Sequence, residues 1–148
     1  MKPRIDYMKK TPGVFEAMLG LEAYLGKSGL DPGLTRLVKL RASQINGCSF
    51  CVDMHFGEAL AAKEDIRKLY FTSARHEAPV FTAKEQAALA WTEAVTRLGD
   101  GGVSDAVYSQ AQAHFSEEEL CNLTLAIVAI NGWNRLNVAL RFPPPSRE

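Results

Sequence analysis

The stretch that decides the fold covers residues 116–140 and reads SEEELCNLTLAIVAINGWNRLNVAL. It opens with a capping box, in which the Ser116 hydroxyl accepts from the third helical amide and Glu119 reaches back to the cap amide. The acidic residues of the first turn complement the helix dipole. Residues 123–130 are apolar all round. The sequence therefore predicts a long helix over about 117–140, at the centre of a bundle or at a subunit interface.

The rest of the chain consists of shorter helical segments separated by glycine and proline. Proline follows a capping residue at Thr11-Pro12 and again at Asp31-Pro32, which is typical of a helix start. Thr82 and Glu85 form a second capping box. We expect an all-α bundle of about six to seven helices, because apolar spacings of three and four favour helices over about 12–25, 32–46, 48–62, 66–71, 82–98 and 104–112.

The composition is that of a globular domain. Among 148 residues, 47% are hydrophobic and 23% are charged, and the 17 basic side chains balance the 17 acidic ones. The length favours one domain over residues 1–148. The balanced charge disfavours a nucleic-acid partner. No segment reaches the roughly 20 apolar residues that span a bilayer, and the N-terminus does not resemble a secretion signal, so we expect a cytoplasmic protein without a membrane partner.

The chemistry concentrates in residues 41–55, RASQINGCSFCVDMH. Cys48, Cys51 and His55 stand at i, i+3 and i+7, which places them on one face of a helix. Asn46-Gly47 ends the preceding helix, so the cysteines fall in the first turn of the next, where free amides stabilise a thiolate. The two sulfurs can close a local disulfide, and His55 can exchange a proton near neutral pH. The pattern indicates an exposed, acidified redox dithiol.

Three other interpretations of the cysteine pair compete with this one. Cysteine is a common small buried residue, so the pair can be purely structural. Two thiolates and an imidazole also suit zinc, but a fourth ligand would have to come from Cys121 or His114 by the chain folding back. A thioredoxin-like site needs a βαβ context, and the helical pattern argues against it.

Residues 40–55 resemble the signature of the AhpD-like alkylhydroperoxidases, within the carboxymuconolactone decarboxylase superfamily. Residues 129–135, AINGWNR, resemble that family's C-terminal signature, and the resemblance covers about residues 6–141. It implies an all-α fold that assembles into dimers, trimers or hexamers. It also implies a peroxidase or dithiol oxidoreductase with a small-molecule hydroperoxide substrate, a thiol or dithiol reductant protein and no cofactor or metal. The decarboxylases proper lack the cysteine pair, so the residues do not suggest lactone decarboxylation.

The resemblance also implies roles for individual residues. Cys51 would be the peroxidatic cysteine that becomes a sulfenic acid, and Cys48 would resolve it as a Cys48–Cys51 disulfide. His55 would belong to the proton relay.

At one position the chain departs from the family pattern, which has a glutamate twelve residues before the first cysteine. Here that residue is Arg36. An arginine cannot act as a general base at physiological pH. Arg36 is therefore a possible modulator, which either favours the thiolate by its charge or pairs with a carboxylate such as Glu58 or Asp53. Dithiol exchange with weak peroxidase activity, a redox-responsive or zinc-binding module, and a catalytically weakened superfamily scaffold stay open.

Several other side chains are candidates for the site or the core. Phe50 lies between the cysteines and is expected to shape access to them. Cys121 is expected to be a small core residue on an apolar helix. Polar residues on that helix, Asn131, Asn134 and Arg135, need partners and are expected to order the site or a subunit contact. Further aromatic candidates for a pocket are Phe56, Trp91 and Trp133, with core packing favoured for both tryptophans.

Overall fold

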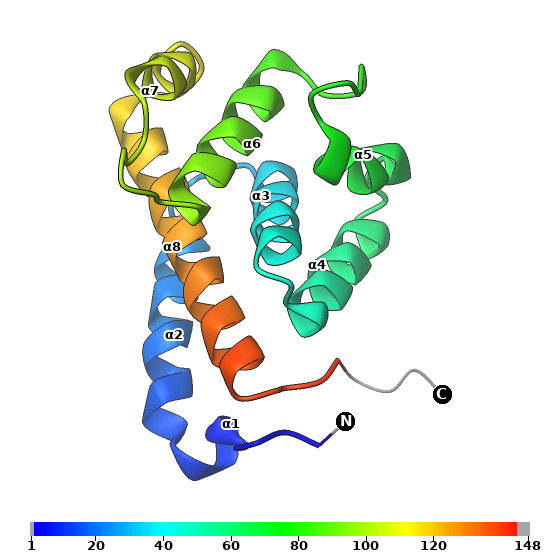
Figure 1. The fold of residues 1–148 in the computed structure, drawn as a ribbon, viewed down its shortest axis with the longest axis vertical. Helices are drawn as coiled ribbons and strands as arrows, with labels where there is room; N and C mark the ends of the chain where they lie inside the picture. Colours follow the sequence, from blue (N-terminus) through cyan, green and yellow to red (C-terminus); the bar gives the residue numbers. More distant parts are fainter. Residues whose placement is uncertain (1, 145–148) are drawn as a thin grey trace.

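The computed structural model describes residues 2–144, and all regular structure in that part of the chain is helical (Figure 1). The all-α class expected from the sequence is confirmed. Two elements lack a sequence counterpart, α1 and the 3₁₀ helix η1, because a single turn is too short for apolar periodicity to show. The elements are α1 (Tyr7–Lys10), α2 (Pro12–Leu25), α3 (Pro32–Ile45), α4 (Ser49–Ala61), α5 (Ile66–Phe71), η1 (Thr72–Ala74), α6 (Ala83–Thr96), α7 (Asp105–Gln112) and α8 (Glu117–Ala139).

The helix starts mostly use the caps that the sequence predicts. Both capping boxes, at Thr82 and Ser116, are formed in full. Asp31 caps α3 by accepting from the amide of Leu34. Thr11 differs, because its hydroxyl makes no bond to α2 and donates instead to the carbonyl of Tyr7 at 3.1 Å. The short α1 ends directly at Thr11, so the hydroxyl satisfies its carbonyl rather than starting the next helix.

Helix α3 lies in the middle of the molecule and contacts α4, α6 and α8, while α2 runs beside α8 (Figure 1). Leu34 and Val38 of α3 pack against Leu123 and Ile127 of α8 in the largest apolar cluster, which also includes Trp91. This cluster therefore holds α3 and α8 against each other. In residues 2–144, no helix is long and apolar enough to cross a membrane.

The apolar surface of α8 is buried along one side only. Ile127 and Ile130 are fully buried, whereas Val128 and Val138 are about half exposed. Cys121 is exposed, so the expectation that it is a core residue is wrong. The neighbouring side chains, Leu120 and Asn122, are buried against the helices that pack on α8, so Cys121 points to another side of the helix.

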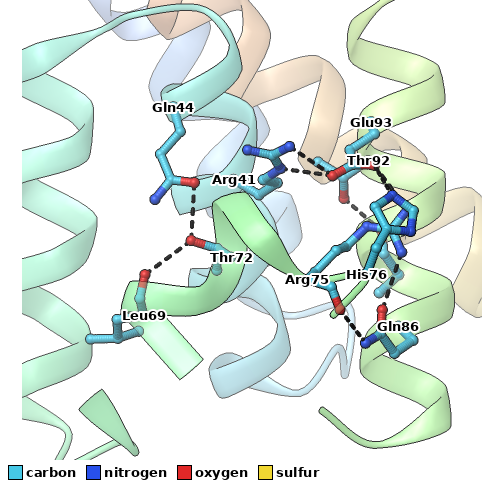
Figure 2. A network of polar contacts seen from close by, with 10 residues as sticks. Arg41, Gln44, Leu69, Thr72, Arg75, His76, Gln86, Thr92 and Glu93 are labelled. Atoms are coloured by element: carbon cyan, nitrogen blue, oxygen red, sulfur yellow. Dashed lines mark hydrogen bonds and ion pairs between the residues drawn. The ribbon is translucent and has the colours of Figure 1, made fainter. Parts of the chain in front are cut away.

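A buried ion-pair network fixes the segment after α5 against α3 and α6 (Figure 2). Arg41 of α3 and Arg75, which follows η1, each place a guanidinium nitrogen 2.8 Å from Glu93 of α6. In the same network Thr72 donates to the side-chain carbonyl of Gln44 at 3.0 Å. The carboxylate of Glu93 therefore bridges the guanidinium groups of two arginine residues that are each less than one-tenth exposed.

Candidate active site

The turn between α3 and α4 sets the position of the first cysteine. Gly47 has a φ of +66°, in the left-handed region that favours glycine. The amide of Cys48 then returns to the carbonyl of Ser43 at 3.0 Å, which closes the end of α3. Cys48 becomes the N-cap of α4, and its Sγ accepts from the amide of Cys51 at 3.3 Å. Both cysteines are therefore in the first turn, where the sequence places them.

The two sulfurs are buried, which corrects the expectation that they are exposed. Cys48 is 1% and Cys51 0% accessible, because Ala42 and Ile130 pack against them. Cys51 nevertheless lines a cavity of about 580 Å³, and Cys48 is not among the residues that line it. The cavity therefore approaches the pair from the side of Cys51.

The cavity lies among α1, α2, α3, α4 and α8. Its wall is largely apolar, and Phe50 and Trp133 belong to it, so core packing is not the whole role of Trp133. Trp91 packs in the core, and Phe56 packs beside Leu40 in another cluster. The apolar lining suits an organic molecule. Other apolar members of the wall are Phe15, Leu19, Leu25, Leu30 and Met54.

His55 and Glu58 form an imidazole–carboxylate pair at the cavity wall. The Nδ1 atom of His55 lies 2.8 Å from Oε2 of Glu58, whereas Nε2 is buried and has no hydrogen-bond partner among the described residues. The hydrogen bond with His55 holds the pKa of the Glu58 carboxyl below its ordinary value, against the opposing effect of burial. An ionised Glu58 keeps the proton on Nδ1, so Nε2 of a neutral ring carries a lone pair.

Arg36 pairs with a carboxylate that the sequence did not suggest. Its Nε donates to Glu64 at 2.6 Å, and Nη2 contacts the same oxygen. The ion-pair partner of Arg36 is therefore Glu64 rather than Glu58, which the sequence suggested as one possible carboxylate. The reason is the bend after α4, where Lys63 has a φ of 59° and the amide of Glu64 returns to α4. The cavity's other cation is paired as well, since Lys39 donates to Glu22 at 2.5 Å.

The pKa values of the two thiols are coupled, because the thiols are hydrogen-bonded to each other. The hydrogen bond from the Cys51 thiol lowers the pKa of the Cys48 thiol to about 7, opposed by burial and helped by the Cys51 amide. The same hydrogen bond raises the pKa of Cys51, and burial raises it further. The first ionisation near neutral pH therefore belongs to the pair.

Asparagines of α8 hold the end of α3 and reach the sulfurs. The side-chain Nδ2 of Asn46 donates to Oδ1 of Asn131 and to Oδ1 of Asn134, each at 2.9 Å, and both asparagines therefore help to order the end of α3. Asn137 donates to Sγ of Cys51 at 3.3 Å and was not singled out from the sequence. Its spacing of three from Asn134, on the buried side of an apolar helix, is the signal that identifies it. Arg135 is exposed and bonds back to Asn131 within α8.

The described part of the chain offers no candidate metal site. Residues 2–144 contain no group of three or more His, Cys, Asp or Glu side chains placed to hold a metal ion.

Comparison with known proteins gives one family and several relatives. Residues 12–94 match the model of the carboxymuconolactone decarboxylase family. The uncharacterised protein YdfG of Bacillus subtilis is 34% identical over 140 residues, which is 95% of each chain. A crystal structure of a protein of unknown function from Agrobacterium tumefaciens, suggested to be the antioxidant defence protein AhpD, is 43% identical. It superposes with a TM-score of 0.95 over 99% of this chain and 100% of that one.

A more distant structure shares the fold alone. The debrominase Bmp8 without ligand is 19% identical and gives a TM-score of 0.82, over 94% of this chain and 75% of that chain.

Proposed function

This chain is an AhpD-like member of the carboxymuconolactone decarboxylase family, and from that premise we propose that it is a cysteine-based alkylhydroperoxidase. The observation that carries the proposal is one cavity whose wall includes Cys51 together with the hydrogen-bonded His55–Glu58 pair. An apolar wall around a thiol and a base suits an organic hydroperoxide. The physiological role would be antioxidant defence, with a thiol or dithiol protein as reductant.

The first step is attack of sulfur on the peroxide. Cys48 holds the lower pKa, but Cys51 lines the cavity, so the proton of Cys51 passes to Cys48 along their hydrogen bond. The Cys51 thiolate attacks one peroxide oxygen, the O–O bond breaks and the sulfur becomes a sulfenic acid. The departing alkoxide takes one proton and leaves as the alcohol. His55 takes up on its Nε2 lone pair the first proton that the thiol pair loses, and returns that proton to the alkoxide.

The second step restores the site. The Cys48 sulfur attacks the sulfenic sulfur, a disulfide forms and water leaves. An external dithiol then reduces the disulfide and is itself oxidised to a disulfide. In total, one hydroperoxide and one dithiol give an alcohol, water and a disulfide.

Glu58 provides what the substitution at position 36 removes. The family pattern places a carboxylate at that position, where this chain has an arginine. Glu58 supplies a carboxylate to His55 from one turn along α4 instead. The charges of Lys39 and Arg36 help to keep Glu58 ionised. The departure at Arg36 is therefore compatible with an intact relay. Assembly into a homo-oligomer stays a prediction.

One equivalent of cumene hydroperoxide is expected to remove two of the three thiols of the reduced protein. The physical reason is that Cys48 lies in the same helical turn as a sulfenic acid at Cys51, which condenses with it faster than it is oxidised further by peroxide. Peptide mass spectrometry should find a Cys48–Cys51 disulfide, and the Cys121→Ser variant should behave identically. Thiols that survive the peroxide would contradict the proposal and favour a scaffold role, as would pairing through Cys121.

The reactivity of the pair is expected to rise with pH and level off just above neutrality. A thiol with a pKa of about 7 is mainly protonated at acidic pH and mainly thiolate in mild base. Alkylation of the pair by iodoacetamide should therefore increase roughly tenfold between about pH 6 and 8, since only the thiolate reacts. Glutathione measured in parallel serves as the reference. An alkylation rate that is still rising above pH 9 would show that the site does not acidify its thiols.

A further inference from the structure

One hydrogen bond reaches the Cys51 sulfur from outside its own helix. Asn137, near the end of α8, donates from Nδ2 to Sγ of Cys51 at 3.3 Å, and its side chain is 3% exposed. A thiol is a weak acceptor, whereas an ionised sulfur accepts strongly. The contact is therefore worth more once Cys51 has lost its proton.

The direction of this amide is fixed by a second contact. The two ends of an asparagine amide have nearly the same shape, so its partners decide which end points where. The Tyr7 hydroxyl lies 3.0 Å from Oδ1 of Asn137. In this arrangement the Tyr7 hydroxyl donates to the carbonyl end of the amide, and the NH₂ end faces the sulfur.

Tyr7 keeps its proton at the near-neutral pH at which the thiol pair loses its first proton. Burial raises the pKa of Tyr7 to about 12, and the neighbouring charges of Cys51 and Cys48 add to the increase. The side chain is 2% exposed. Tyr7 is therefore a steady donor to Asn137 at any pH at which the dithiol works.

The N-terminal segment is anchored so that the tyrosine stays in place. The amide of Arg4 donates to the carbonyl of Leu140 at 2.8 Å, which ties the segment to the end of α8. The ring of Tyr7 packs against Phe142 with centroids 5.6 Å apart, and Phe142 packs against Phe50. The described N-terminal segment and the segment after α8 both lie at this end of the molecule (Figure 1).

We propose that Asn137 is a catalytic residue that donates a hydrogen bond to the ionised Cys51 sulfur, and that Tyr7 is the positioning residue that directs its amide. The inference rests on the proposed peroxidase function and deepens it. A hydrogen-bond donor that stabilises the thiolate increases the fraction of Cys51 that is ionised at neutral pH. This increase is larger than the accompanying decrease in the intrinsic nucleophilicity of the sulfur. The donor thus increases the reactive population.

The chain contains a matched control for this arrangement. Tyr24 of α2 donates to Oδ1 of Asn122 on α8 at 3.1 Å, the same pairing at the other end of that helix. Neither residue lines the cavity. Variants of this pair lose the same kind of hydrogen bond without touching the site.

The test uses protein carrying Cys48→Ser and Cys121→Ser, in which Cys51 is the sole thiol. Titration of thiolate absorbance against pH should show about tenfold less thiolate at a given pH after Asn137→Leu, since a hydrogen bond to a charged group is lost. Tyr7→Phe keeps the ring packing and should reduce the thiolate about threefold, because the amide keeps its donor but loses its fixed direction. Tyr24→Phe and Asn122→Leu should titrate as the parent does.

The outcomes test the role of the Asn137 hydrogen bond separately from the proposed peroxidase function. Folded Tyr7→Phe and Asn137→Leu proteins that both titrate like the parent would overturn the inference. If Asn137→Leu does not fold, Tyr7→Phe, which removes one hydroxyl, decides alone. Hydroperoxide consumption by the wild type is measured separately. A protein that consumes none but shows the thiolate changes refutes the proposed function and keeps the donor, whereas an active protein without them refutes the donor alone.

Discussion

Replacing Glu93 with glutamine is expected to lower the free energy of unfolding by about 3–5 kcal/mol, the usual cost of breaking a buried ion pair from one side. Glu93 is the shared partner of Arg41 and Arg75, and both arginine residues are less than one-tenth exposed (Figure 2). A neutral amide keeps the size of the side chain but leaves two buried positive charges without a counter-charge. Denaturation by urea, followed by circular dichroism, measures the difference.

The pH dependence of this loss provides an internal check. Burial alone would raise the pKa of the Glu93 carboxyl, but hydrogen bonds from Arg75 and Arg41 outweigh it and hold the pKa below its ordinary value. A lowered pKa contributes stability at neutral pH that disappears as the pH falls through the carboxyl's pKa in the folded protein. Wild type and Glu93→Gln should therefore converge in acid, where a protonated glutamic acid resembles glutamine.

The control for this experiment is an exposed ion pair. Lys9 is 84% exposed and lies 3.4 Å from Asp6. Exchange of Lys9 for glutamine should change the stability by less than about 1 kcal/mol, because solvent screens exposed pairs. A Glu93→Gln protein as stable as Lys9→Gln would show that the buried network is not needed to hold α3, η1 and α6 together.

Exchange of Cys51 for serine is expected to slow hydroperoxide consumption by about a thousandfold or more, as removal of a nucleophile does in other enzymes. An alcohol at this position neither ionises near neutral pH nor takes up the peroxide oxygen. The assay follows loss of cumene hydroperoxide with dithiothreitol as reductant. Consumption at the wild-type rate would remove the peroxidatic role from Cys51.

The Cys48→Ser variant tests which sulfur attacks the peroxide and which one forms the disulfide with it. Access favours Cys51 as the sulfur that attacks, since Cys51 lines the cavity, whereas the lower pKa belongs to Cys48. We expect Cys48→Ser to consume one equivalent of peroxide and to carry a dimedone-reactive sulfenic acid on Cys51, because no resolving sulfur remains. A sulfenic acid found instead on Cys48 of the Cys51→Ser variant would reverse the assignment.

The local features of the fold follow from the sequence. Capping boxes at Thr82 and Ser116 and the proline after Asp31 mark helix starts that the structure contains. Gly47 marks the turn that places Cys48 at the start of α4. Each of these signals acts between residues a few positions apart, so the sequence alone is sufficient to identify them.

The partners of the site residues were beyond reach of the sequence, with one exception. Glu58 pairs with His55 at a spacing of three, which helical geometry allows to be predicted. Arg36 instead bonds to Glu64, and Asn137 receives its hydrogen bond from Tyr7, which is 130 positions away in the chain. Residues so far apart meet only through the packing of whole helices.

The sequence by itself determined the helical class, the helix starts and the placement of a dithiol with a phased histidine at a helix N-terminus, because these depend on local spacing. The tertiary structure alone decided that both sulfurs are buried and that Cys51 is the one that lines the cavity. It also decided which amide the sulfur meets. Burial and long-range hydrogen bonds arise where helices pack, and the side chains that pack together are set by the relative positions of the helices rather than by spacing along the chain.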